Sequence, residues 1–240
     1  MTKHVSELQA LLADVGAGAA ASQLIEWDFA RWRDALERAP LAHVTVPALE
    51  DLEDRWADDD GITRSAVTEV AGADPVRLLV TSMAWGFGSL PYGPSRTAKM
   101  LATPHAASIL GDIAEAARGG PGPAFAALFR RGRARIPGLS IAMGSKVLYF
   151  AAGGLAARRS DPLIYDANVY WALANLEGGW PGAPDPGRRM SAEDYARYVA
   201  RMDGYAEESG LGRDDVEVAL FRTTRWLRRR RRLARIQSEE

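Results

Sequence analysis

Two residues of this sequence, Lys146 and Asp166, are of the types that carry covalent and electrostatic catalysis. Lys146 is followed by the apolar run Val-Leu-Tyr-Phe at 147–150. A lysine in surroundings of low dielectric gives up its ammonium proton more readily, and the free amine is a nucleophile that forms Schiff bases. A carboxylate near a carbon that develops positive charge stabilises that charge and can orient a nucleophile. Lys146 and Asp166 are therefore candidate catalytic residues, the first as a nucleophile and the second as a charge-stabilising carboxylate.

The segment that must position this pair is 125–176. Its pattern predicts a helix over 125–131, a turn at Ile136-Pro-Gly-Leu-Ser140, a helix over 141–152, a loop, and a helix over 167–176 directly after Asp166. A tight Pro-Gly turn directs the free N–H groups of the second helix outward, which makes an anion site suited to a phosphate.

Four residues at this turn are predicted to contact phosphates. Gly138 lets the backbone approach closely, and the Ser140 hydroxyl is a further donor. Arg133 and Arg135 stand just before the turn and would neutralise phosphate charge.

A second basic segment lies near the C-terminus, where arginines crowd 222–235 and include Arg228, Arg229 and Arg230. The formal net charge of the chain is −1, but a concentrated basic face still attracts a polyanion through its local potential. We predict that this segment contacts a phosphate backbone; a merely solvated basic face fits the pattern equally well.

Composition excludes several other classes of site. The 240 residues are 47% hydrophobic and 25% charged, which is typical of a globular protein. The absence of cysteine excludes disulfides, Cys-ligated iron–sulfur clusters and Cys-based zinc sites. The three histidines, His4, His43 and His105, are far apart, so we predict no metal site and no cofactor.

The apolar periodicity predicts an all-α fold with about ten helices and no strand pair. One helix is expected over 24–36, and 43–47 is expected to be a connector that ends at Pro47. The sequence shows neither a signal-peptide pattern at its start nor an apolar run of about 18 residues. We therefore expect a cytoplasmic protein that does not bind membranes.

The segment 125–176 resembles the helix-hairpin-helix DNA glycosylases, the superfamily that includes 8-oxoguanine DNA glycosylase. In that family a Leu-Pro-Gly-Val-Gly-type hairpin precedes a helix that carries a catalytic lysine in bifunctional members. A Pro-Val-Asp-type segment then places the catalytic aspartate. Here 136–140 is similar to the hairpin, and 161–166 is similar to the aspartate segment.

The position of the family's lysine has two readings in this sequence. Counting from the hairpin places Ala142 there, whereas the spacing to the aspartate favours Lys146. The two positions are one helical turn apart and share a face of the helix.

The resemblance implies a two-lobed helical fold with a cleft, and a DNA glycosylase that flips out a modified base and cleaves its N-glycosidic bond. The implied partner is duplex DNA with a modified base. A flipped base needs aromatic faces in its pocket, and the predicted candidates are Trp85, Phe87, Tyr165 and Trp171, with Tyr92 and Tyr170 as further ones. We predict one glycosylase-like unit over 1–240, with the hairpin and catalytic segment at 125–176 and a basic helix at 214–240.

Other readings of the same residues remain open at this stage. Lys146 is also compatible with a lysine whose head lies in solvent, and Asp166 with a simple helix cap. A non-catalytic helix-hairpin-helix DNA-binding protein would need only the hairpin and the basic tail, and a helical protein–protein adaptor would need neither. For a glycosylase, an oxidised purine is the substrate that the named relative implies, whereas resemblance to glycosylase-fold defence proteins implies a modified cytosine of phage DNA.

Overall fold

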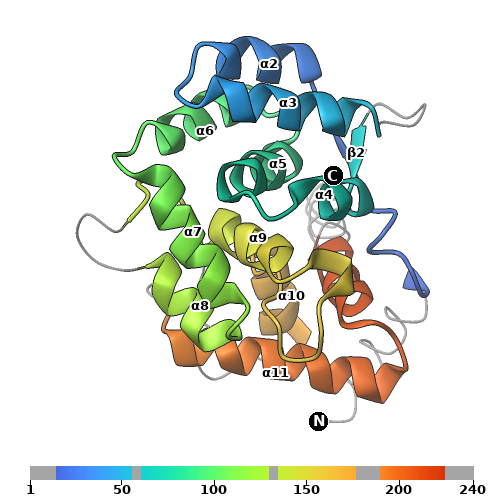
Figure 1. Ribbon diagram of the computed structural model, residues 1–240. Helices are drawn as coiled ribbons and strands as arrows, with labels where there is room; N and C mark the ends of the chain where they lie inside the picture. The colour runs from blue at the N-terminus through green and yellow to red at the C-terminus, as the bar shows by residue number, and fades with distance from the viewer. Residues whose placement is uncertain (1–14, 56–60, 130–134, 177–189, 225–240) are drawn as a thin grey trace, which may run out of the picture.

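The computed structural model describes residues 15–55, 61–129, 135–176 and 190–224, and this part of the chain is mainly helical (Figure 1). The elements in chain order are β1 (Leu24–Glu26), α2 (Phe29–Glu37), α3 (Ala42–Glu53), β2 (Gly61–Thr63), α4 (Arg64–Ala71), α5 (Pro75–Phe87), α6 (Gly93–Leu101), α7 (Ala106–Ala117), α8 (Pro121–Leu128), α9 (Ile141–Ala151), the short 3₁₀ helix η2 (Gly154–Ala156), α10 (Ala167–Leu176) and α11 (Ala192–Ser209). A further helical stretch covers 213–224. The all-α prediction is confirmed.

Helix α5 lies at the centre of the fold. Asp74 caps its N-terminus by accepting hydrogen bonds from the amides of Val76 and Arg77, at 2.9 and 2.8 Å, and Pro75 occupies the first turn. Nearly every side chain of α5 is buried. A helix that is apolar all round must be covered on all sides, and α5 packs against α3, α4, α6, α7 and α9.

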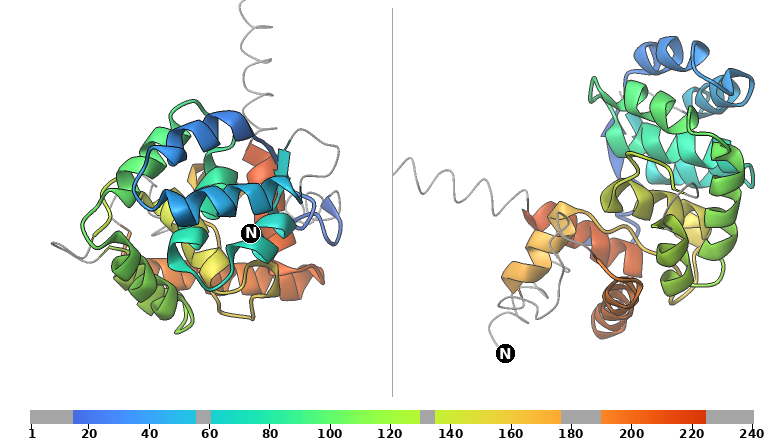
Figure 2. Two further views of the ribbon diagram at one scale, coloured as in Figure 1. Left: turned by 45° about the horizontal axis from the view of Figure 1, so that its top comes forward. Right: turned by 90° about the vertical axis from the view of Figure 1, so that its left-hand side faces the viewer.

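The helices around α5 form two groups. Helices α2, α3 and α6 lie together above α5 in Figure 1, and α11 runs along the opposite side of the molecule. Figure 2 shows α10 and the stretch 213–224 side by side, away from α2 and α3. Helix α8 connects α11 to the rest, because it packs on both α11 and α7, and α7 packs on α5.

The structure differs from the sequence prediction at 24–26 and 61–63, which form a small antiparallel sheet. Ile25 pairs with Ile62 in this sheet, and α2 begins only after Asp28, whose side chain caps it. A Cβ atom at Gly61 would lie 2.4 Å from the carbonyl oxygen of Ile25, so only glycine allows this approach. The strand partner is far away in the sequence, and local periodicity therefore could not reveal the pairing.

The predicted connector at 43–47 is also wrong, since these residues belong to α3. Thr45, Leu49 and Leu52 are fully buried, and α3 packs against α2 and α5. Burial of this face outweighs the local cost of Pro47, which removes one hydrogen bond from the helix.

The two ends of the described chain are joined by one carboxylate. Asp215 accepts hydrogen bonds from the amides of Gly18 and Ala20, both at 2.9 Å, across 195 positions of sequence in the second case. The side chain is buried. This contact fixes the segment that leads into β1 against the stretch 213–224.

Gly88 ends α5 and lies against the backbone of β1, so a substitution there probes the packing between these two elements. Its φ is +55°, and a Cβ atom would lie 2.5 Å from Cγ2 of Ile25 and 2.6 Å from the carbonyl oxygen of Glu26. We expect Gly88→Ala to lower the free energy of unfolding by about 2 kcal/mol or more, because backbone strain and a backbone clash add. The matched control is Gly111→Ala in α7, where no atom lies within 4 Å and the change should stabilise the helix by roughly 0.5–1 kcal/mol. Urea unfolding measures both, and equal midpoints would contradict the prediction.

Candidate active site

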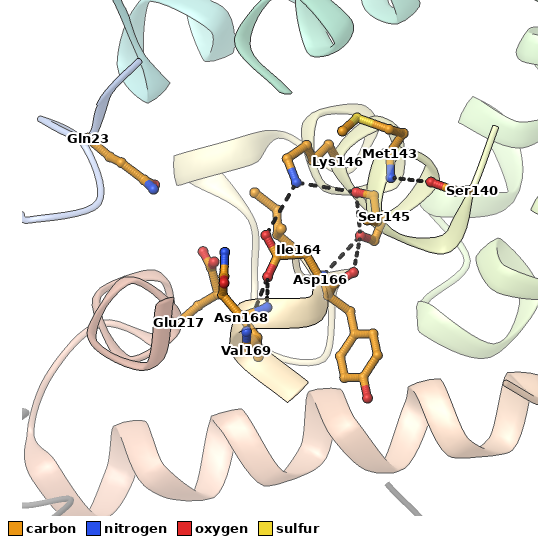
Figure 3. Close-up of polar contacts among 12 residues, drawn as sticks. Gln23, Ser140, Met143, Ser145, Lys146, Ile164, Asp166, Asn168, Val169 and Glu217 are labelled. Carbon is orange, nitrogen blue, oxygen red and sulfur yellow. Dashed lines mark hydrogen bonds and ion pairs between the residues drawn. The ribbon is translucent and has the colours of Figure 1, made fainter. Parts of the chain in front are cut away.

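Lys146 lies in α9 with its side chain 8% exposed, and its ammonium group is directed at Asp166 (Figure 3). The distance from Lys146 Nζ to Asp166 Oδ2 is 3.7 Å. Nζ also donates a hydrogen bond to the carbonyl oxygen of Ala142 at 3.3 Å, and it lies 5.9 Å from the centre of the Trp85 ring. The lysine head is therefore in the interior beside a carboxylate and an aromatic face, which excludes the solvent-exposed reading.

The stem of Lys146 occupies space that Gly86 leaves open. A Cβ atom at position 86 would lie 2.9 Å from Lys146 Cδ and 3.1 Å from Met143 Sδ. Helices α5 and α9 pack directly on one another. The missing side chain on α5 thus defines the path by which the lysine reaches Asp166.

Asp166 uses its two carboxylate oxygens for different contacts. Oδ1 accepts hydrogen bonds from the amides of Asn168 at 2.9 Å and Val169 at 3.1 Å, which caps α10. Oδ2 faces Lys146. The negative charge is favoured at the start of a helix, and the cap fixes the direction in which the second oxygen points. The cap role and a chemical role are therefore compatible at this residue.

The Ser145 hydroxyl joins α9 to the backbone just before Asp166. It accepts a hydrogen bond from the Tyr165 amide at 2.9 Å and donates to the Tyr165 carbonyl oxygen at 3.1 Å. The side chain is fully buried. Because Ser145 precedes Lys146 and Tyr165 precedes Asp166, this link sets the distance between the lysine and the aspartate.

Lys146 and Asp166 border a cavity of about 310 Å³. This volume lies within the range of sites for small organic groups. The lining comes from the start of the described chain, α5, α9, the beginning of α10 and the stretch 213–224; it comprises Gln23, Ile25, Trp85, Gly86, Ala142, Met143, Lys146, Ile164, Asp166, Ala167, Asn168, Glu217 and Phe221.

One wall of the cavity is charged. Glu217 is 1% exposed and lies 2.6 Å from Nη2 of Arg64, which is completely buried. Burial raises the pKa of the Glu217 carboxyl above its ordinary value, and the charge of Arg64 opposes that rise. Burial acts to lower the pKa of Arg64, but Glu217, Tyr149 and Asp214 together outweigh it and the net shift is upward. Arg64 Nη2 also donates to Gln23 Oε1.

The structure places the predicted aromatic residues in different environments. Trp85 lines the cavity, with its ring 3% exposed. Phe87 packs on Tyr92, and Tyr165 is buried against Tyr198, so neither lines it. Trp171 is 46% exposed on α10 and does not line it either. Sequence position alone could not rank these rings, because each stands in a helix or beside one.

The residues predicted to bind phosphate are only partly described. Gly138 has φ of +85°, and Ser140 caps α9 by accepting a hydrogen bond from the Met143 amide at 3.4 Å. Arg135 is exposed. Arg133, Arg228, Arg229 and Arg230 lie outside the described residues, as does most of the predicted basic helix at 214–240. Phosphate contacts at all of these positions remain predictions.

No described helix is both long enough and apolar enough to cross a membrane. Within 15–55, 61–129, 135–176 and 190–224, no group of three or more His, Cys, Asp or Glu side chains is arranged to hold a metal ion.

Comparison with known families identifies the family of this chain. Residues 18–221, most of the chain, match the family described as "Putative 8-oxoguanine DNA glycosylase OGG-like protein". The chain belongs to this family. The matched range contains every residue that lines the cavity. No curated protein and no solved structure matched the chain.

Several residues at the cavity of this OGG-like protein were not predicted from the sequence. Gln23, Glu217 and Phe221 line the cavity, and Arg64 supports it, yet none was a candidate. The sequence holds a signal for Glu217, because it is the single acidic residue inside the apolar run 216–221. An acidic side chain that is buried with such a run is seldom without a charged partner, so its position indicates a buried ion pair.

The link between Ser145 and Tyr165 can be tested in this OGG-like chain by Ser145→Ala. The change leaves the buried Tyr165 amide without its acceptor, so we expect the free energy of unfolding to fall by about 1–3 kcal/mol. The control is Ser95→Ala, whose exposed hydroxyl bonds to the Tyr92 carbonyl oxygen and should matter by less than about 0.5 kcal/mol. Thermal or urea unfolding measures both, and an Ser145→Ala protein as stable as the control would refute the role of this link.

Proposed function

We propose that this OGG-like protein is a DNA glycosylase that excises a modified base from duplex DNA, with Lys146 and Asp166 as its catalytic residues. The observation that carries the proposal is the 3.7 Å approach of Lys146 Nζ to Asp166 Oδ2 at the edge of a cavity of about 310 Å³. The family match supports the reaction class.

In the proposed reaction, the target nucleotide leaves the stack and its base enters the cavity. The amine of Lys146 attacks the sugar carbon C1′ once it has released its ammonium proton, which Asp166 Oδ2 is placed to receive. The electrons of the bond between C1′ and the base nitrogen leave with the base, which takes up a proton. Asp166 passes that proton to the departing base, and its carboxylate, charged again, stabilises the positive charge that develops on the sugar. Opening of the sugar ring then yields a Schiff base on Lys146, the intermediate of a lyase.

A water molecule replaces the amine in the second route that the same residues allow. Asp166 then orients the water toward C1′ and stabilises the sugar cation, and the product is an abasic site without strand cleavage. The two routes differ in one observable, because only the amine route leaves a covalent link between protein and DNA that borohydride can reduce.

The test uses the wild-type protein and duplexes that carry one modified base each, including an oxidised purine and a glucosylated cytosine. Mass spectrometry detects the released base, and denaturing gels detect the adduct trapped by borohydride. We expect base release with a trapped adduct. Release from the oxidised purine supports repair, and release from the glucosylated cytosine supports phage defence. A protein that binds every duplex and releases no base would be a DNA-binding protein, and the proposal would be wrong.

Variants of the pair assign the roles. Asp166→Asn keeps an oxygen that can cap α10 but removes the charge, and we expect base release to slow by roughly 10²–10³-fold. Lys146→Ala should abolish trapping, while Lys99→Ala, which changes an exposed lysine in α6, should leave both readouts unchanged. Circular dichroism and melting of each variant check that the fold is retained. Undiminished trapping in Lys146→Ala would remove the lysine from the mechanism.

A further inference from the structure

The backbone that leads to Asp166 is buried, yet it belongs to no regular element. Residues 157–166, between η2 and α10, form neither helix nor strand, and 161–165 are all buried. Buried N–H and C=O groups need hydrogen-bond partners, which a helix or a sheet would supply from the backbone itself. In this loop, which reaches α11 in Figure 1, side chains supply most of them instead.

Two tyrosines of α11 bind the middle of this loop through their hydroxyl groups. The Tyr195 hydroxyl accepts a hydrogen bond from the Leu163 amide at 3.1 Å and donates one to the Leu163 carbonyl oxygen at 2.5 Å. The Tyr198 hydroxyl donates to the Ile164 carbonyl oxygen at 2.5 Å. Both side chains are fully buried, and burial raises the pKa of each hydroxyl above its ordinary value. Both hydroxyls therefore stay protonated and remain donors.

A buried ion pair holds the start of the same loop. Arg213 Nε lies 3.1 Å from Asp203 Oδ1, and Arg213 Nη2 donates to the Asp161 carbonyl oxygen at 2.5 Å. Asp203 Oδ2 accepts a hydrogen bond from the Ser160 amide at 3.0 Å. Ser160 has φ of +65°, a conformation that residues other than glycine adopt rarely and that persists only where surrounding contacts maintain it. The path of the loop is thus set by α11 and the stretch 213–224.

The rings of the two tyrosines have a packing role that is separate from that of their hydroxyls. Tyr195 stacks on Phe125, with 5.0 Å between ring centres, and Tyr198 packs edge-on against Tyr165 at 4.8 Å. A phenylalanine would serve this packing equally well. What the hydroxyls add is a fixed position for the backbone of 163–164, two residues before Asp166.

We infer that Tyr195 and Tyr198 are positioning residues for the proposed reaction, because their hydroxyls hold the backbone that directs Asp166 Oδ2 at Lys146. The inference rests on the proposed function, since it concerns the carboxylate of that reaction. Neither tyrosine lines the cavity, so both act through the backbone and touch no reacting atom. A displacement of about 1 Å at a reacting group can slow catalysis roughly 100-fold, even when its cause lies outside the site.

The test removes the hydroxyls and keeps the rings, in Tyr195→Phe, Tyr198→Phe and the double variant. Base release is followed in single turnovers with protein in excess over the duplex that the wild type cleaves best, and the dissociation constant for that duplex is measured separately. We expect the rate constant to fall about 10-fold in each single variant and further in the double variant. The dissociation constant should not change, because the cavity lining is intact. An unchanged rate constant in the folded double variant would overturn the inference and leave the glycosylase function standing.

The matched control is Thr97→Val, which also removes a buried hydroxyl that donates to a backbone carbonyl oxygen, that of Gly93 at 3.0 Å. It should lower the melting temperature as the tyrosine variants do, without slowing base release. All rates are measured well below the lowest melting temperature of the set. An equal loss of rate in Thr97→Val would show that lowered stability alone is the cause, and the inference would be wrong. If the double variant does not fold, the two single variants decide.

Amide hydrogen exchange gives a readout that does not depend on catalysis. The amides of Asn168 and Val169 donate to Asp166 Oδ1, so their protection reports the position of this carboxylate. We expect both amides to exchange about 10-fold faster in the tyrosine variants, with no change at the amides of α7 and none at 168 and 169 in Thr97→Val. If the wild type releases no base but this pattern is found, the proposed function fails and the positioning of Asp166 by α11 stands. Unchanged protection at 168 and 169 would overturn the inference whatever the catalytic result.

Discussion

The contact between Arg64 and Glu217 connects two parts of the fold that are far apart in the sequence. It joins the first turn of α4 to the stretch 213–224, with both side chains out of water. A buried ion pair of this kind offsets its desolvation only with good geometry, and removing one partner leaves a charge that nothing compensates. Such a pair is a weak source of stability but a strong constraint on which arrangement is allowed. Here the allowed arrangement is the one that closes the cavity.

The lysine and the aspartate are positioned by a different kind of constraint. Backbone groups hold Asp166, through its cap on α10, and the neighbouring Tyr165, through Ser145. Lys146 follows a path left open by Gly86. These contacts leave the side chains of Asp166 and Lys146 little conformational freedom. Charged groups that are held in position in advance need no rearrangement during a reaction. The site therefore relies on local geometry to position Lys146 and Asp166, the proposed reactive groups, and on a long-range ion pair for its far wall.

This division explains which parts the sequence could predict. Some helix starts follow a local code that is legible in the sequence, as with Asp74-Pro75 before α5 and the Ser191–Asp194 capping box before α11. The helices around Lys146 and Asp166 followed from spacing within fifty residues, and the structure brings the two side chains together. Gln23 and Glu217 meet only through tertiary packing, so no window on the sequence contains both. The strand pair and the helical placement of Pro47 escaped prediction for the same reason: packing with distant partners overrode local preference.

The hydrogen bonds from Gly18 and Ala20 to Asp215 have a consequence for the order in which the protein acquires its site. A chain emerging from the ribosome can form α4 to α9 and bury their shared apolar surface while residue 215 has yet to be made. Until Asp215 is made, residues 18–20 lack the two hydrogen bonds that hold them against the stretch 213–224. Closing a contact over 195 positions is also among the slowest steps in folding. A nascent or truncated chain with α4 to α9 folded thus still lacks the wall of the cavity that Glu217 and Phe221 form.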